Sequence, residues 1–205
     1  MIRSLHVSQY VVYALAATFA VAILCVRPAH ADLAISGAGS AQQAQIKSIY
    51  AGMIPAVFKS TSALPVTVLG DHDMNSYIDR GSGQSADTND DDTIDGIFED
   101  APSRITLRGS TDASDMPFTF AHEYGHYVWE TFLTKADRDN YGKIYKTQLR
   151  AHRLITDYAA TDVFEGFAEA FSFYIVDKNQ LSRRDNLSCQ FLDDVLARMN
   201  THKST

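Results

Sequence analysis

The feature that most constrains this chain is a His-Glu-x-x-His pattern in residues 118–129, which read FTFAHEYGHYVW. On an α-helix, residues four positions apart lie on the same face, about one turn from each other. His122 and His126 would therefore present two imidazoles to one point in space, which suits Zn2+. Glu123 lies about 100° around the helix from His122. A carboxylate there can take a proton from a metal-bound water that attacks a carbonyl carbon.

The pattern by itself is also compatible with a core helix that carries two incidental histidines. Two histidines do not hold a catalytic zinc ion, because such a site has three protein ligands. The third ligand has to come from elsewhere in the chain.

Residues 1–31 have the composition of a signal peptide. Arg3 precedes an apolar run over residues 10–26, and the segment ends in Ala29-His30-Ala31, an Ala-x-Ala site for signal peptidase. The apolar run is shorter than a membrane span, which requires about 20 residues. We therefore predict cleavage after Ala31 and a secreted or periplasmic protein without a stable membrane anchor. Residues 32–205 would then form a single domain.

Charge and cysteine content exclude several other classes of protein. The chain has a net charge of −7 with neutral histidines, and the predicted leader contains Arg3 and Arg27 but no acidic residue. The cleaved chain is therefore more negative, which argues against nucleic acid or an anionic membrane as a partner. Only Cys189 follows the leader, so an intramolecular disulfide and a Cys-rich zinc site are excluded. We expect a monomer whose partner is a protein or peptide substrate.

The spacing of apolar residues predicts an α+β domain, with strands before the His-Glu-x-x-His helix and helices after it. Residues 104–108 alternate in polarity, and we predict that Arg104, Ile105, Thr106, Leu107 and Arg108 form an exposed edge strand that binds an extended substrate. Residues 81–93 (GSGQSADTNDDDT) read as an exposed acidic loop. The other predicted strands are residues 65–69, 76–79 and 96–99, and the other predicted helices are residues 41–60, 135–152, 161–179 and 182–199.

The best candidates for the third ligand lie in residues 158–171, which read YAATDVFEGFAEAF. Glu165 and Glu169 are one turn apart on a predicted helix whose other residues are almost all apolar or small. Burying two carboxylates without partners is costly, and a dication and a ligand imidazole would offset that cost. The alternative is that both glutamates face solvent. The spacing leaves open which glutamate binds the metal and which one orients a ligand histidine through a hydrogen bond.

Taken together, the His122–His126 pattern, Tyr158 and residues 165–171 (EGFAEAF) resemble the catalytic domain shared by anthrax lethal factor and the secreted Pro-Pro endopeptidases, which are gluzincin metalloproteases. The resemblance covers residues 97–179, and the small size and signal peptide are most similar to the Pro-Pro endopeptidase branch. It implies a zincin-like fold, in which a small mixed sheet with an exposed edge strand packs on a mainly helical zinc-binding half.

The resemblance also implies roles for individual residues. It assigns one Zn2+ per chain to His122, His126 and Glu165, and it makes Glu169 the residue that orients a ligand. Tyr158, seven residues before Glu165, would hydrogen-bond the tetrahedral oxyanion. The sequence departs from the family at residue 166, where a glycine replaces an expected aromatic residue, and this departure puts local packing and substrate fit in doubt.

We therefore predict a secreted zinc-dependent endopeptidase that uses a metal-activated water, with Glu123 as the general base. The resemblance adds a preference for proline near the cleavage site. One alternative is a secreted zinc-binding interaction module without turnover, in which a protein side chain closes the fourth metal position. Another is a helical domain without metal, which requires both glutamates and at least one of the two histidines to be exposed.

Overall fold

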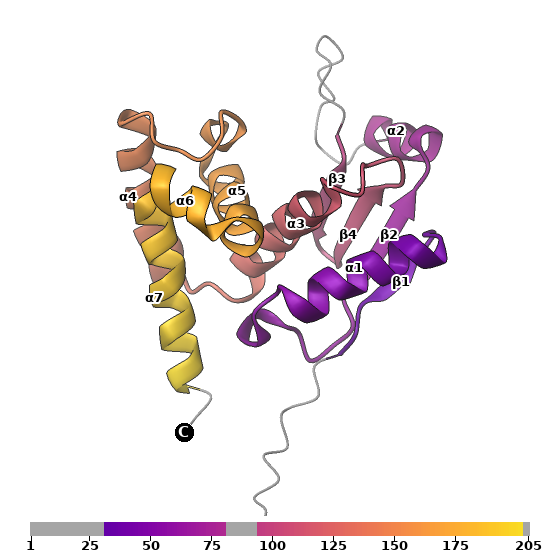
Figure 1. Cartoon of the computed structure of the whole chain (residues 1–205), viewed down its shortest axis with the longest axis horizontal. Helices are drawn as coiled ribbons and strands as arrows, with labels where there is room; N and C mark the ends of the chain where they lie inside the picture. The colour runs from indigo at the N-terminus through magenta and orange to yellow at the C-terminus, as the bar shows by residue number, and fades with distance from the viewer. Residues whose placement is uncertain (1–30, 81–93, 203–205) are drawn as a thin grey trace, which may run out of the picture.

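A small mixed sheet and a larger group of helices make up the part of the chain that the structure describes, residues 31–80 and 94–202 (Figure 1). The structure is a computed structural model. The predicted α+β class is confirmed. Residues 1–30 of the predicted leader (residues 1–31) and the predicted acidic loop, residues 81–93, lie outside the described residues, and both stay predictions. Within the described residues, no helix has the length and apolar content needed to cross a membrane.

The sheet contains four strands in the order β1-β2-β4-β3. Strands β1 (Ala34–Ser36) and β4 (Ser103–Arg108) both run parallel to β2 (Pro65–Leu69), and β3 (Gly96–Asp100) runs antiparallel to β4. The prediction that residues 104–108 form an exposed edge strand is therefore wrong. A tight turn joins β3 to β4, and the two strands pair along one side of β4. Strand β2 pairs along the other side of β4. Within the described residues β3 pairs only with β4 and β1 only with β2, so β3 and β1 are the two edge strands of the sheet.

Helices cover both faces of the sheet. On one face, α1 (Ser40–Gly52) and α3 (Met116–Thr131) bury the inward residues of β2 and β4 in the main core. The other face carries α2 (Asp71–Asp79), whose Met74 and Ile78 pack with a residue of β3 in a smaller cluster. The predicted strand at residues 76–79 is wrong, because these residues form the last turns of α2. The four-residue spacing of the apolar Met74 and Ile78 indicates a helix, but the segment 76–79 on which the strand was predicted contains only one of these two residues.

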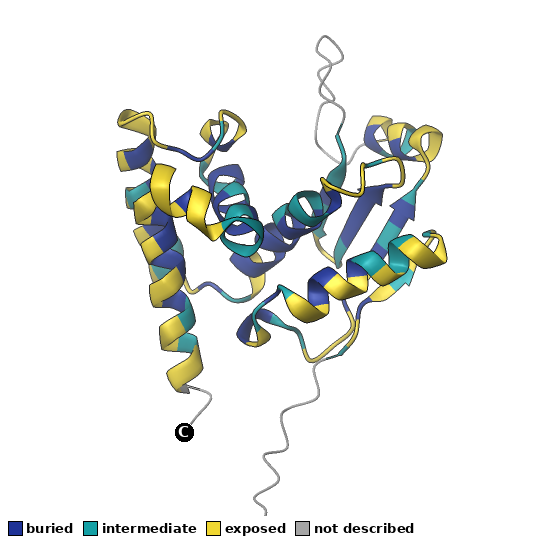
Figure 2. Cartoon of the chain, viewed as in Figure 1, coloured by how far each residue is buried: buried dark blue, intermediate teal, exposed yellow. Residues whose placement is uncertain are grey.

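The remaining helices form the second half of the fold, around a central α5 (Val163–Val176). Most of α3 is buried, and α5 is buried or half-buried along its whole length (Figure 2). The predicted helix at residues 182–199 is part of α6 and α7, which meet at the buried Asp185. The surrounding elements are α4 (Lys135–Arg150), α6 (Lys178–Arg184), α7 (Asn186–His202) and a short 3-10 helix, η2 (Tyr158–Ala160). A second 3-10 helix, η1 (Ala56–Phe58), lies between α1 and β2 in the chain and belongs to the sheet half.

The two halves meet where α3 packs on α5. Gly125 of α3 allows this close approach, because a methyl group at that position would lie 3.0 Å from Cα of Ala168 on α5. A second link comes from the sheet half, where the hydroxyl of Tyr124 donates a hydrogen bond to the carbonyl of Phe58 over 2.8 Å, and the Phe58 ring packs on Phe171 of α5. The predicted ligand residues lie on these two helices, at the junction of the halves.

Candidate metal centre

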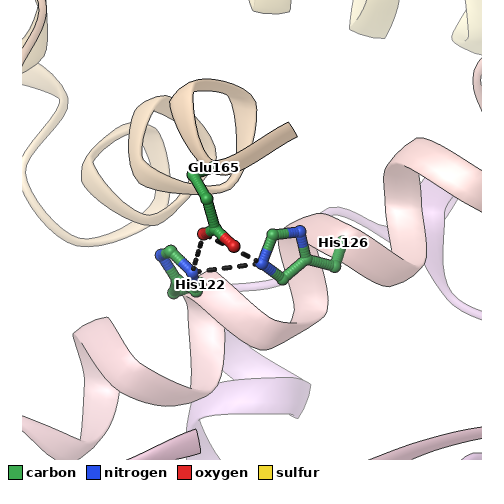
Figure 3. Close-up of side chains that lie close together, drawn as sticks. All are labelled: His122, His126 and Glu165. Carbon is green, nitrogen blue, oxygen red and sulfur yellow. Dashed lines mark hydrogen bonds and ion pairs between the residues drawn. The ribbon is translucent and has the colours of Figure 1, made fainter. Parts of the chain in front are cut away.

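Three donor groups converge between α3 and α5 (Figure 3). Nε2 of His122 lies 3.0 Å from Oε2 of Glu165, and Nε2 of His126 lies 3.3 Å from the same oxygen. The two imidazole Nε2 atoms are 3.1 Å apart. The i, i+4 spacing on α3 brings the imidazoles together as predicted, and α5 supplies the carboxylate.

These separations fit a single bound metal ion. Ligand atoms held at about 2.0–2.1 Å from a tetrahedral ion are about 3.3 Å from one another. The three side chains are nearly buried, with exposed fractions of 12% for His122, 5% for His126 and 8% for Glu165. A buried cluster of this kind needs a positive charge to balance the carboxylate. The group can therefore bind a metal ion.

In the metal-free chain, a proton on His122 can supply that charge. Burial acts to lower the pKa of His122, but hydrogen bonds to Glu165 and Glu169 outweigh it and raise the pKa to about 10. Burial acts in the opposite direction on Glu165, but its hydrogen bonds with His122 and His126 lower the pKa to about 2. Both pKa shifts indicate that the site favours a positively charged group beside the ionised carboxylate of Glu165.

Glu169 fixes the orientation of His122. Nδ1 of His122 lies 2.8 Å from Oε1 of Glu169, so a neutral imidazole that donates there keeps the Nε2 lone pair directed at the other donors. This contact distinguishes the two glutamates of α5, which spacing alone left open. Oε2 of Glu169 accepts a hydrogen bond of 2.6 Å from Thr156, whose hydroxyl also accepts one from the backbone of Ala159. Sequence reasoning missed Thr156, because no pattern links it to Glu169.

Glu123 lies beside the donor cluster without being part of it. Its carboxylate is buried and reaches β3, where it accepts a hydrogen bond from the backbone N–H of Phe98. Burial raises the pKa of Glu123 above its ordinary value, and the neighbouring imidazoles oppose the rise. A carboxyl group with a raised pKa beside a metal position is well suited to accept and return a proton.

Tyr158 lies at the start of η2, and its ring centroid is 5.8 Å from that of His122. Tyr158 is 53% exposed, so the residue is accessible to a ligand. Burial of part of the ring and the nearby carboxylates of Glu165 and Glu123 raise its pKa. The hydroxyl is therefore protonated at neutral pH and is available as a hydrogen-bond donor.

The five residues predicted to bind substrate lie on the inner strand β4 and are not part of the donor cluster. Ile105 and Leu107 are buried in the main core. Arg104 forms an ion pair with Glu99, and the buried Arg108 binds the carbonyl of Ile94. Thr106 is also buried within the sheet. Strand β4 therefore supports the sheet half from its centre, and the strand that contacts α3 beside the donors is β3.

Comparisons with known proteins add no identification. No protein-family model matches the chain, and no curated protein matches it. The resemblance drawn from the sequence motifs stays a prediction.

Proposed function

We propose that the chain is a secreted zinc-dependent endopeptidase that hydrolyses peptide bonds of protein substrates. The observation that supports this proposal is the convergence of His122, His126 and Glu165, with the buried carboxylate of Glu123 beside them. Two imidazoles and one carboxylate are the ligand set of many catalytic zinc sites. Zinc bound by these residues would lower the pKa of a coordinated water and polarise the scissile carbonyl.

The chain's own residues move the proton and hold the substrate. Glu123 takes a proton from the attacking water as the new C–O bond forms, and delivers it to the leaving amine as the C–N bond breaks. Tyr158 keeps its proton and donates a hydrogen bond to the developing oxyanion. Glu169 holds His122 throughout, because its contact with Nδ1 does not involve the reacting atoms.

Strand β3 takes the substrate-binding role in this proposal. The backbone N–H of Arg108 donates to the carbonyl of Asp95 over 2.8 Å, so alternate residues of β3 direct their backbone groups toward β4. The backbone groups of Gly96 and Phe98 point to the opposite edge, where no strand pairs with β3 within the described residues and the Glu123 carboxylate meets the N–H of Phe98. An extended peptide can add to this edge and run past the donor cluster.

The substitution Glu123→Gln tests the proposal. Gln has the same shape but cannot accept the proton, so we expect zinc to be retained and hydrolysis to fall by about 10² to 10⁴. Metal content is measured by elemental analysis. Hydrolysis is measured on a peptide library that includes proline-containing sequences, with and without a chelator.

Two results would contradict the proposal. An undiminished rate in Glu123→Gln would show that Glu123 is not the general base. Purified wild-type protein that binds no zinc would show that the three donor side chains do not form a zinc site. Zinc without cleavage of any library peptide would favour the metal-binding module without turnover.

A further inference from the structure

The two ligand histidines are held in different ways. Nδ1 of His122 contacts a carboxylate oxygen of Glu169. Nδ1 of His126 is buried and has no hydrogen-bond partner in the part of the chain that the structure describes. When Nε2 of a neutral imidazole binds a metal, Nδ1 carries the proton. His126 therefore lacks the hydrogen bond that usually fixes the tautomer and the ring orientation of a metal ligand.

Aromatic rings take the place of that hydrogen bond. The ring of Phe164 is stacked on His126 with centroids 4.0 Å apart and an interplanar angle of 26°. A second ring, from Phe98, lies farther away at 6.4 Å and is nearly parallel, with an angle of 22°. The two rings come from α5 and β3, the elements that flank α3 (Figure 1).

Stacking restricts the imidazole in a way that suits a ligand. A parallel neighbour at 4.0 Å fixes the plane of the ring, because tilting it would cause a clash or a gap. Within that plane, only one of the two flipped orientations directs Nε2 at Glu165. The other orientation places a carbon atom there. The contact with Oε2 of Glu165 at 3.3 Å then selects the productive orientation.

Phe164 is itself well fixed. Asp162 caps α5, and its Oδ1 accepts hydrogen bonds from the backbone N–H of Phe164 over 2.7 Å and from that of Glu165 over 2.9 Å. The Phe164 ring also meets Trp129 of α3 edge-on at 6.2 Å. One cap therefore sets the backbone of both the ligand carboxylate and the ring that stacks on His126.

We propose that Phe164 is a positioning residue for His126, and that its stacked ring fixes the orientation of the imidazole in place of the missing hydrogen bond to Nδ1. The inference rests on the proposed metal site. It also distinguishes the two imidazoles chemically. A carboxylate partner raises the basicity of a ligand histidine, so His126 is the weaker donor of the pair.

The test compares Phe164→Leu, which removes the ring, with Phe164→Tyr, which keeps it. Zinc affinity is measured by competition with a chromophoric chelator, and ligand geometry by the visible absorption of the cobalt-substituted protein. Phe164→Leu should lower zinc affinity by about 10- to 100-fold, the range seen when an outer partner of a metal ligand is lost, and should shift the cobalt bands. Phe164→Tyr should retain the affinity and spectrum of the wild type.

Phe173→Leu is the matched control. Phe173 lies on the same helix, is partly buried and forms a ring pair with Phe118 at 5.0 Å. This variant should lose thermal stability without losing zinc affinity. If Phe164→Leu does not fold, Phe164→Met fills the space without a ring and serves in its place.

The outcomes separate the inference from the proposed function. A wild-type chain that binds neither zinc nor cobalt would overturn the metal site itself. A wild-type chain that binds both, with unchanged affinity and spectrum in Phe164→Leu or Phe164→Met, would overturn only the role of Phe164. Equal losses in Phe164→Tyr and Phe164→Leu would also overturn it, because the tyrosine keeps the ring.

Discussion

The position of Glu123 depends on a residue that has no side chain. Gly96 of β3 faces the Glu123 carboxylate, and a methyl group at residue 96 would lie 2.6 Å from both Cγ and Oε1 of Glu123. No Cβ atom tolerates such a contact, so any other residue at this position would push the carboxylate away. Gly96 thus provides the space in which the proposed general base lies.

The substitution Gly96→Ala should therefore reduce hydrolysis while leaving zinc bound. Misplacing a reacting group by about 1 Å can cost about 10²-fold in rate, and we expect a loss of that order in kcat/KM. Zinc content should not change, because the three atoms nearest to the added methyl group all belong to Glu123 and not to a ligand side chain. Gly142→Ala is the control, since a methyl group there meets no atom within 4 Å. A normal rate in Gly96→Ala would show that Glu123 has room to move.

At this scale, local spacing predicted much of the centre. The i, i+4 rule brought His122 and His126 together, and the resemblance selected Glu165 over Glu169. Spacing could not find Thr156, Gly96 or the rings around His126. Their roles arise from contacts between elements that are distant in sequence, which a one-dimensional pattern does not contain.

At the scale of elements, Gly166 explains how η2 is held. A methyl group at residue 166 would lie 2.7 Å from two ring carbons of Tyr145 on α4. The Tyr145 ring therefore occupies the space beside α5 that a side chain at residue 166 would fill. Its hydroxyl donates to the carbonyl of Ala160 over 3.1 Å, which ties α4 to the short helix that carries Tyr158.

Gly166→Ala should displace Tyr145 and loosen η2. Forcing a methyl group into a packed contact costs about 1–3 kcal/mol of unfolding free energy, which chemical denaturation would measure. The value of kcat should fall because Tyr158 shifts, whereas zinc affinity should hold. Adding Tyr145→Leu removes the clashing ring and should recover part of the stability, but kcat should stay low because the hydrogen bond from Tyr145 to Ala160 is lost as well. A stable and fully active Gly166→Ala variant would contradict the role given to Tyr145.

The start of α4 gives a pH-dependent prediction. Thr134 and Asp137 form a capping box, and Asp137 also pairs with Arg198 of α7 over 2.6 Å. Burial acts to raise the pKa of Asp137, but hydrogen bonds with Thr134 and the charge of Arg198 outweigh it, so the pKa is lowered. A lowered pKa means that this stabilisation is present above the unfolded value of about 3.9 and is lost as the pH falls through the folded value.

The stability of Asp137→Asn should therefore approach that of the wild type in acid. At neutral pH we expect a loss of about 1 kcal/mol, typical of a helix cap, and the difference should shrink below about pH 4. Asp139→Asn removes an exposed pair with Lys135 on the same helix and should have a smaller effect. Urea titrations across this pH range provide the measurement. A difference that persists at low pH would contradict the assignment.

The elements themselves were largely predictable from sequence, but their arrangement was not. Alternation in residues 104–108 correctly predicted a strand. Its place in the middle of the sheet depends on pairing with residues of β2 that lie 39 positions earlier in the sequence. It also depends on the turn that pairs β3 with its other side. Local patterns do not encode such pairings, so the edge strand was assigned to β4 instead of β3.

For the whole molecule, the candidate metal centre lies where the two halves meet. His122 and His126 come from α3, which packs on the sheet, and Glu165 comes from α5, the centre of the helical half. The main hydrophobic core runs through both halves without a break. A metal ion bound at the junction therefore stabilises the contact on which the arrangement of both halves depends, and bound metal should raise the stability of the whole chain.

Removal of the metal should lower the melting temperature by roughly 5–10 °C. A ligand that binds only the folded state at a free concentration of about 100 times its Kd adds about 2.7 kcal/mol, and about 1 kcal/mol shifts the melting temperature by about 2–4 °C at this chain length. Differential scanning calorimetry with and without a chelator measures the shift. The variant His126→Ala should melt at one temperature in both conditions, because it lacks a ligand. A chelator effect of equal size in His126→Ala would place the stabilising metal elsewhere in the chain.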